Sequence, residues 1–295
     1  MQCSVVIPCH NDAATIAGAL ESVRIQDHPA TEIIVVDDAS EDDSAAVATA
    51  TGMPARILRV EHRNAAAARN AGIAAASCEW VAFLDADNHW LRDHLATAQA
   101  LLEAGGDGIF HASPLAAGQQ APGGVGVMRR RHPMKVSATG LDRDTFLRWR
   151  LRWGWGFPTT GIVASRSILE RIGGFDVTQI RRHDFELVMR AICHTTWCAT
   201  PHSTWYSRPT QPGDISADPV ACAFYAFRAL ERNQTRYSGA TFSWLLSRSA
   251  YHAALTAYRY GHHQSISDAI KSGKEYLLPY HIAKLFLFTL RNFLK

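Results

Sequence analysis

The sequence lacks several features that would assign it to a specialised class. No apolar run reaches the roughly 18 residues that a membrane-spanning helix requires. The six cysteines show no Cys-x-x-Cys spacing, so we expect reduced thiols rather than a disulfide framework. A net charge of +3 is too small to favour binding to nucleic acid. No signal peptide is visible before the first apolar segment, and we therefore expect a cytoplasmic protein.

Glycine-rich phosphate loops are missing as well. A dinucleotide-binding dehydrogenase would carry Gly-x-Gly-x-x-Gly after its first strand, whereas this chain has the segment 8–12, Pro-Cys-His-Asn-Asp. The P-loop pattern is also absent. A sugar-phosphate nucleotidyltransferase would need a glycine-rich loop with a basic residue at the same place. These absences count against three classes of nucleotide-binding α/β enzyme, although the nucleotidyltransferase stays an alternative.

Short apolar segments alternate with segments of helical spacing in the first third of the chain. Apolar runs at residues 4–8, 32–36 and 80–84 predict buried strands, and the segment 55–60, which contains two arginines, is expected to be a further strand. Helices are expected between them, and residues 217–295 show helical spacing with no clear strand. Strands that alternate with helices predict an α/β fold with a mostly parallel central sheet and helices on both faces.

Acidic residues follow two of these strands at the point where each strand ends. Asp37 and Asp38 follow the second strand, and Asp85 and Asp87 follow the fourth. Ligands of an open α/β sheet bind beyond the carboxyl ends of its strands. Carboxylate oxygens there suit Mg²⁺ or Mn²⁺, and few protein ligands would leave positions for substrate phosphates. A solvated turn is the alternative for Asp-x-Asp taken alone.

Several motifs in order resemble glycosyltransferase family 2 over residues 3–216. They are the segments 4–11, 32–40, 64–72 and 83–87, followed by Thr160-Gly161, Gly173-Gly174-Phe175-Asp176 and 183–187. The resemblance implies the Rossmann-like GT-A fold and sugar transfer from a nucleoside diphosphate with a metal ion, Mn²⁺ or Mg²⁺. It divides the chain into a nucleotide-sugar-binding half (1–110), an acceptor half (111–216) and a C-terminal helical region (217–295).

The resemblance also implies roles for residues of the donor half. Pro8 and His10 would flank the nucleotide base, with His10 standing where the family usually has Tyr. Asp38 would accept a hydrogen bond from a base N–H, which favours uracil or thymine, and Arg69 would contact the base or a phosphate. A helix N-cap is the alternative for Asp38, and a surface ion pair is the alternative for Arg69.

The metal would be bound at the Asp-x-Asp segment. The resemblance implies that Asp87 binds the ion directly, while Asp85 contacts the ribose or a metal-bound water. Both residues are therefore candidates for the metal site.

For the acceptor half, the resemblance assigns the catalytic base to Asp184. The residue before it is His183, where an acidic residue is more usual. Glu186 is a rival base, and a helix N-cap is the alternative role for Asp184. Arg208 is a candidate contact for the donor diphosphate.

We therefore expect a metal-dependent inverting glycosyltransferase that uses a UDP-sugar and a saccharide or lipid-linked acceptor. Such an enzyme would act in polysaccharide biosynthesis. A nucleotidyltransferase and a non-catalytic nucleotide-binding relative are the alternatives. The apolar stripe 282–293 with basic residues opposite suggests either peripheral contact with the inner face of the membrane, or packing on the catalytic domain or a second subunit.

Overall fold

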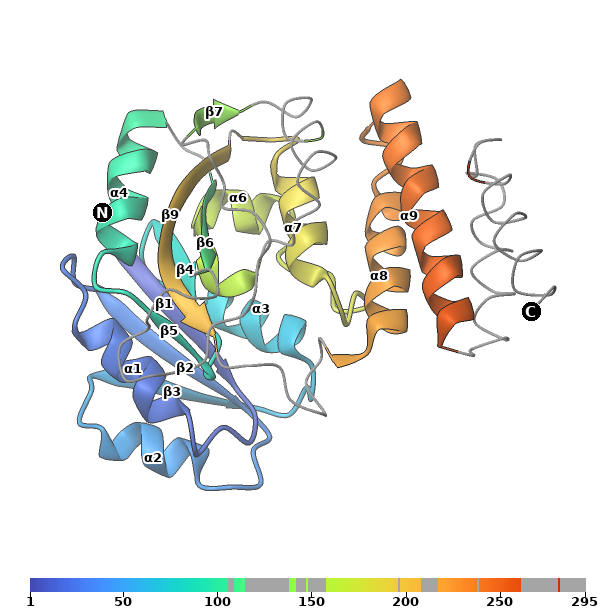
Figure 1. The fold of residues 1–295 in the computed structure, drawn as a ribbon. Coiled ribbons are helices and arrows are strands. Elements are labelled where there is room, and N and C mark those ends of the chain that lie inside the picture. The colour runs from blue at the N-terminus through green and yellow to red at the C-terminus, as the bar shows by residue number, and fades with distance from the viewer. Residues whose placement is uncertain are drawn as a thin grey trace. The chain divides into compact units, whose positions relative to one another are not determined.

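The computed structural model describes residues 1–105, 109–114, 138–141, 147, 158–195, 197–207, 217–237, 239–260 and 281. Its strands form one mixed sheet (Figure 1). The strands are β1 (Cys3–Cys9), β2 (Glu32–Asp38), β3 (Ala55–Val60), β4 (Trp80–Phe83), β5 (Asn88–Trp90), β6 (Ile109–Pro114), β7 (Ala138–Leu141), β8 (Ile162–Ser165) and β9 (Trp197–Ser207). All four strands predicted for the first third of the chain are confirmed.

Helices separate the first four strands, as the alternating pattern predicts. The described helices are α1 (Ile16–Arg24), α2 (Ser44–Ala50), α3 (Ala65–Ala75), α4 (His94–Gly105), α6 (Arg166–Arg171), α7 (His183–Ala191), α8 (Pro219–Arg232) and α9 (Ala240–Arg259). A 3₁₀ turn, η2 (Thr159–Gly161), precedes β8. No described helix is long and apolar enough to cross a membrane.

The sheet has the strand order β3-β2-β1-β4-β8-β6-β9-β5, with β7 paired to β9. Strands β3, β2, β1 and β4 are parallel, whereas β8 is antiparallel to both β4 and β6. The chain moves outward from β1 to β3 and then returns to place β4 on the other side of β1. The order thus reverses at β1, so the carboxyl ends of β1 and β4 form a topological switch point.

Alternate residues of β1 face opposite layers of helices. Val5 and Ile7 lie in one core cluster with Ile16 and Leu20 of α1. Val6 faces α3, where a Cβ on Gly72 would lie 2.3 Å from Val6 Cγ1. Helix α3 therefore lies so close to the sheet that only glycine fits at this position, and helices cover both faces of the parallel strands.

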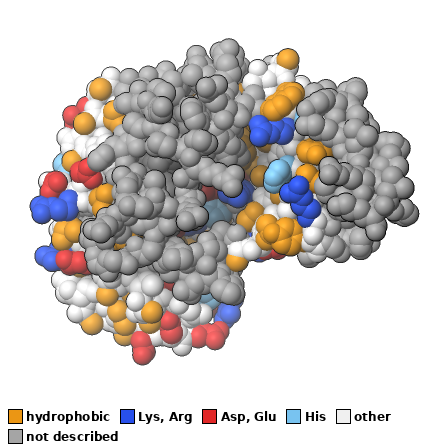
Figure 2. All heavy atoms as spheres, viewed as in Figure 1, with side chains coloured by type: hydrophobic (Ala, Val, Ile, Leu, Met, Phe, Trp, Pro, Cys, Tyr) orange, Lys and Arg blue, Asp and Glu red, His pale blue; other side chains and the backbone are white. Residues whose placement is uncertain are grey.

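The chain divides into two compact units. The first contains residues 1–146 and 155–210, and the second contains residues 147–154 and 211–295. In the second unit, Asp218 caps α8 by accepting hydrogen bonds from the N–H groups of Val220 and Ala221, each at 3.0 Å. Figure 2 shows acidic and basic side chains next to one another at the left edge of the described surface and several acidic side chains at its lower edge.

Candidate active site

The polar residues at the rim of the parallel strands form the candidate site. His10 follows β1, Asp38 ends β2, and Asp85 follows β4. Because β1 lies between β2 and β4, these three strand ends are neighbours on one edge. The sequence prediction that the acidic strand ends converge is therefore confirmed.

Asp38 is buried and holds the loop that leads into α3. Its Oδ1 accepts hydrogen bonds from the N–H groups of His62 at 2.6 Å and Arg63 at 2.8 Å. Its Oδ2 accepts one from the N–H of Asn64 at 2.7 Å. Asp43, not Asp38, is the N-cap of α2, which excludes the helix-cap alternative. A carboxylate offers about four acceptor positions, and these three bonds use all but one of them.

His10 is exposed beside Asp38, and its hydrogen bonds define its tautomer. Its Nδ1 lies 2.6 Å from the carbonyl oxygen of Asp38, which can only accept. Nδ1 therefore carries the proton, and Nε2 faces Nδ2 of Asn11 at 3.3 Å as an acceptor. The ring stays at the rim, where an exposed face can stack on a planar group.

Arg69 lies at the centre of the site and is buried, with 5% of its surface exposed. Its Nη2 donates to Oδ1 of Asp85 at 2.5 Å, and its Nη1 donates to the carbonyl of Ala65 at 3.2 Å. Its Cζ lies 5.6 Å from the ring centre of Phe175. The surface ion pair considered as an alternative for Arg69 is therefore excluded, because the guanidinium is enclosed in the protein.

Asp85 is fixed from two further directions. Its N–H donates to Oγ1 of Thr160 at 3.1 Å, and Nδ2 of Asn88 reaches its Oδ2 at 3.3 Å. Asn88 also donates to the Thr160 hydroxyl at 2.8 Å. Turn η2, which precedes the neighbouring strand β8, thus supports the Asp-x-Asp segment. About one quarter of the Asp85 side chain remains exposed.

The carboxylates of Asp85 and Asp87 are the donors that a hard divalent ion would use at this rim. Asp87 is half-buried. Within the described part of the chain, no group of three or more His, Cys, Asp and Glu side chains could hold a metal ion. The pair of Asp85 and Asp87 fits Mg²⁺ or Mn²⁺, because these ions bind one or two carboxylates and complete their coordination shell with water and substrate phosphates.

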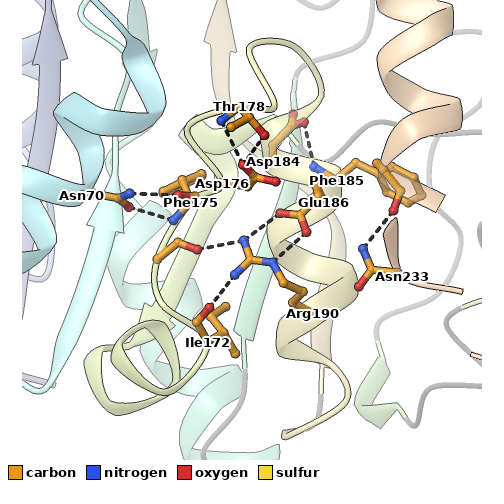
Figure 3. A network of polar contacts seen from close by, with 12 residues as sticks. Asn70, Ile172, Phe175, Asp176, Thr178, Asp184, Phe185, Glu186, Arg190 and Asn233 are labelled. Atoms are coloured by element: carbon orange, nitrogen blue, oxygen red, sulfur yellow. Dashed lines mark hydrogen bonds and ion pairs between the residues drawn. The ribbon is translucent and has the colours of Figure 1, made fainter. Parts of the chain in front are cut away.

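The turn at residues 173–176 connects α3 to the acceptor half. Asn70 donates from Nδ2 to the carbonyl of Phe175 at 2.8 Å and accepts from the Phe175 N–H at 2.7 Å (Figure 3). Gly174 has a φ of +67°, and a Cβ there would lie 2.3 Å from Oδ1 of Asn70. Only glycine therefore permits this double hydrogen bond, which places the Phe175 ring near Arg69.

Asp184 lies in the first turn of α7, beside His183. The N-cap of α7 is Arg182, so the capping alternative for Asp184 is excluded. Burial raises the pKa of the Asp184 carboxyl, while nearby Arg182 and the hydrogen bond from the Phe185 N–H lower it. A carboxylate with a raised pKa is a better proton acceptor, as a general base requires.

Glu186, the rival base, serves a structural ion pair (Figure 3). Arg190 donates to both of its carboxylate oxygens, from Nε at 2.7 Å and from Nη2 at 2.6 Å. The same guanidinium donates to the carbonyls of Ile172 at 2.6 Å and Gly174 at 2.8 Å. Glu186 is also buried, with 2% of its surface exposed, so it anchors the 172–174 turn rather than facing a substrate.

Sequence reasoning missed some residues of the site and named one that lies beyond the described residues. Asn88 carries no signal in the sequence, and Thr160 and Asn70 belong to segments that resemble the family but receive no role from the resemblance. Arg208, the candidate diphosphate contact, lies outside the described residues. The signal that could have identified Thr160 is its place before a strand that borders β4.

Comparison with known proteins then identifies the family. The family model described as glycosyl transferase family 2 matches residues 4–173, which is more than half of the chain. This chain belongs to glycosyl transferase family 2. The match contains His10, Asp38, Arg69, Asp85 and Asp87 and ends at the glycine turn.

Curated relatives in the family cover part of the chain. An uncharacterised glycosyltransferase of Nostoc is 32% identical over 197 residues, which are 61% of this chain and 56% of the relative. The succinoglycan biosynthesis protein ExoU of Rhizobium meliloti is 30% identical over 220 residues, 72% of this chain and 63% of that protein. The chain thus spans little more than half the length of these relatives.

Solved structures support the GT-A fold. The S. aureus TarS fragment 1–349 in complex with UDP-GlcNAc superposes with a TM-score of 0.74 at 16% identity, covering 96% of this chain and 83% of that one. The mannosyltransferase PcManGT of Pyrobaculum calidifontis, in complex with GDP-Man and Mn²⁺, gives 0.64 at 20% identity, with coverage of 98% and 79%. The predicted α/β fold with extra C-terminal helices is therefore confirmed.

Proposed function

We propose that this protein is a metal-dependent inverting glycosyltransferase that moves a sugar from a nucleoside diphosphate sugar to a hydroxyl acceptor. The observation that carries the proposal is the hydrogen-bonded chain from Asp85 through Arg69 to His183, the residue before Asp184. It brings an Asp-x-Asp rim and a carboxylate with a raised pKa into one compact unit. Sugar transfer requires both groups, the first for the diphosphate and the second for the acceptor proton.

The donor would occupy the rim of β1, β2 and β4. Pro8 and His10 would flank the base, and the remaining acceptor position of Asp38 would receive the base N–H, which favours a uracil base. Arg69 is enclosed, so it would act on the donor through Asp85 rather than by direct contact with a base or phosphate. Arg208 stays the proposed contact for the diphosphate.

Asp87 would bind the divalent cation, and Asp85 would orient its water or the ribose. The ion, Mn²⁺ or Mg²⁺, would supply positive charge that neutralises the departing diphosphate. This use of metal is supported by the donor set at the rim and by PcManGT, whose complex contains Mn²⁺.

Asp184 would take the proton of the acceptor hydroxyl as that oxygen attacks the anomeric carbon. The bond to the diphosphate breaks on the opposite side, so one displacement inverts the anomeric centre. Relatives named for succinoglycan and amylovoran biosynthesis favour a saccharide or lipid-linked acceptor. Contact of the C-terminal stripe 282–293 with a membrane or a second subunit stays a proposal, because those residues lie outside the described chain.

A thermal-shift screen of nucleotide sugars with and without Mn²⁺ tests the donor class. Binding to the folded state at a hundredfold excess over Kd raises the free energy of unfolding by about 2.7 kcal/mol. We expect stabilisation by UDP-sugars that requires Mn²⁺. A nucleoside diphosphate product would support transfer, whereas released pyrophosphate would favour the nucleotidyltransferase.

A further inference from the structure

His183 connects the helix that carries Asp184 to the donor side of the site. It is the first residue of α7, and 8% of its surface is exposed. Its Nε2 lies 2.9 Å from Nη1 of Arg69. Its ring meets the Phe175 ring edge-on, with centroids 5.7 Å apart and planes at 74°. Phe175 therefore supports both the imidazole and the guanidinium that the imidazole contacts.

The Arg69 contact defines the protonation state of His183. A guanidinium carries only donors, so the His183 Nε2 must accept and its Nδ1 must carry the proton. Burial and the adjacent Arg69 charge lower the pKa of His183 to about 3. The imidazole is thus a neutral acceptor at any ordinary pH.

We propose that His183 is a positioning residue, whose Nε2 fixes the Arg69 guanidinium so that Arg69 holds Asp85 in the orientation that the donor requires. The inference rests on the proposed transferase function and extends it to the residue before the base. An arginine side chain has many rotamers, and losing them has a free-energy cost. Hydrogen bonds to His183, Ala65 and Asp85 leave the guanidinium one orientation.

A neutral acceptor at position 183 has an electrostatic consequence. An acidic residue there would place a second carboxylate against Arg69, and the two carboxylates would compete for one guanidinium. Because position 183 is a histidine, Arg69 forms its ion pair with Asp85, and the structure shows no second carboxylate paired with Arg69 among the residues it describes. The full charge of Arg69 then acts on the Asp-x-Asp rim.

Two substitutions separate positioning from packing. Both His183→Gln and His183→Met remove the ring from Phe175, but only glutamine keeps an acceptor at about the place of Nε2. We expect His183→Met to lower kcat about tenfold to a hundredfold, the range for one hydrogen bond to a charged group. His183→Gln should stay within about threefold of the wild type by the same reasoning, because the bond to Arg69 is kept. Both variants should lose stability in urea unfolding because both lose the ring, and His183→Met should lose more because it also breaks the bond to Arg69.

A double-mutant cycle in urea unfolding with Arg69→Met provides an independent readout. We expect a coupling between positions 69 and 183 for His183→Met and little coupling for His183→Gln. Equal losses of kcat in the two His183 variants would overturn the inference. If the wild type turns over no nucleotide sugar, the proposed function fails, and the double-mutant cycle alone tests the role of His183. Zero coupling would then overturn the inference, whereas a coupling seen only with His183→Met would support it.

Discussion

Arg69 and Asp85 form a short ion pair, with Nη2 of Arg69 2.5 Å from Oδ1 of Asp85. The pair joins α3 to the end of β4 across the point where the strand order reverses. The arginine is buried, whereas about one quarter of the Asp85 side chain is exposed, so the carboxylate is held by the protein and still partly accessible. The protein thus supplies a pre-oriented carboxylate at the place where the donor phosphates are proposed to bind.

Asp184→Asn should lower kcat by about 10²–10⁴-fold, the usual contribution of general base catalysis. Donor affinity should change little, because the proposed donor contacts come from other elements. Steady-state kinetics together with calorimetry of UDP binding would measure both quantities. Full activity in this variant, or an α-linked product from an α-linked donor in NMR, would contradict the assigned base and the inverting mechanism.

Glu186→Gln serves as the structural counterpart of that variant. It removes the charge that pairs with Arg190 inside the protein, so we expect a loss of stability of about 3–5 kcal/mol for a broken buried pair. Urea unfolding would measure this loss, and the kcat of the folded fraction should stay near that of the wild type. A 10²-fold loss of kcat with unchanged stability would instead identify Glu186 as the base.

The pH dependence of kcat/KM should report the raised pKa of Asp184. An ordinary aspartate has a pKa of about 3.9. Because burial raises the pKa of Asp184, the base loses its function at a higher pH on acidification than an ordinary aspartate would. We expect the acidic limb of the pH profile to have a pKa above that of an ordinary aspartate. We also expect this limb to disappear in Asp184→Asn. An unchanged limb in the variant would assign it to another group.

Gly174→Ala should be more destabilising than Gly173→Ala. Both glycines have positive φ, and either alanine costs about 1–2 kcal/mol in backbone strain. A Cβ on Gly173 meets nothing within 4 Å, whereas one on Gly174 would collide with Oδ1 of Asn70. The lost pair of hydrogen bonds adds about 1 kcal/mol each. Equal destabilisation of the two variants in urea would refute this account of the turn.

Asp38→Asn should weaken both the fold and UDP binding. An amide NH₂ in place of one oxygen would face a backbone N–H donor of the loop at residues 62–64, leaving buried donors unpaired at a cost of about 1–3 kcal/mol. Asp37→Asn is the control, because Asp37 accepts one backbone N–H, from Ser40 at 3.1 Å. Tighter binding of GDP than UDP by the wild type would contradict the proposed base preference.

The sequence predicts which acidic residues lie at the edge of the sheet, because the signals for strand ends are local. Apolar strands that end in Asp38 and Asp85 must deliver these residues to one edge of a parallel sheet. The apolar strands also predict helices on both faces of the sheet, and the contacts of Val5 and Val6 confirm this. No such rule predicted β5, whose residues Asn88–Trp90 are too few to show a period.

The contacts between the halves of the site could not be predicted in the same way. Arg69 and His183 are 114 positions apart, and only the folded chain reveals that they share a hydrogen bond. Glu186 is a rival base to Asp184 in the sequence, and both residues lie in the first turn of α7. They differ because Arg190, one helical turn after Glu186, forms an ion pair with Glu186. The same guanidinium donates to the carbonyl groups of Ile172 and Gly174.

The most direct test of the account is calorimetry of UDP binding to the wild type and to Asp87→Asn, with and without Mn²⁺. The proposed ion is held by Asp87 and shared with the donor diphosphate, so its loss should remove the metal-dependent part of the binding. We predict that Mn²⁺ strengthens UDP binding at least tenfold in the wild type, an effect of about 1.4 kcal/mol, and has little effect in Asp87→Asn. Equal strengthening by Mn²⁺ in both proteins would show that the metal site lies elsewhere.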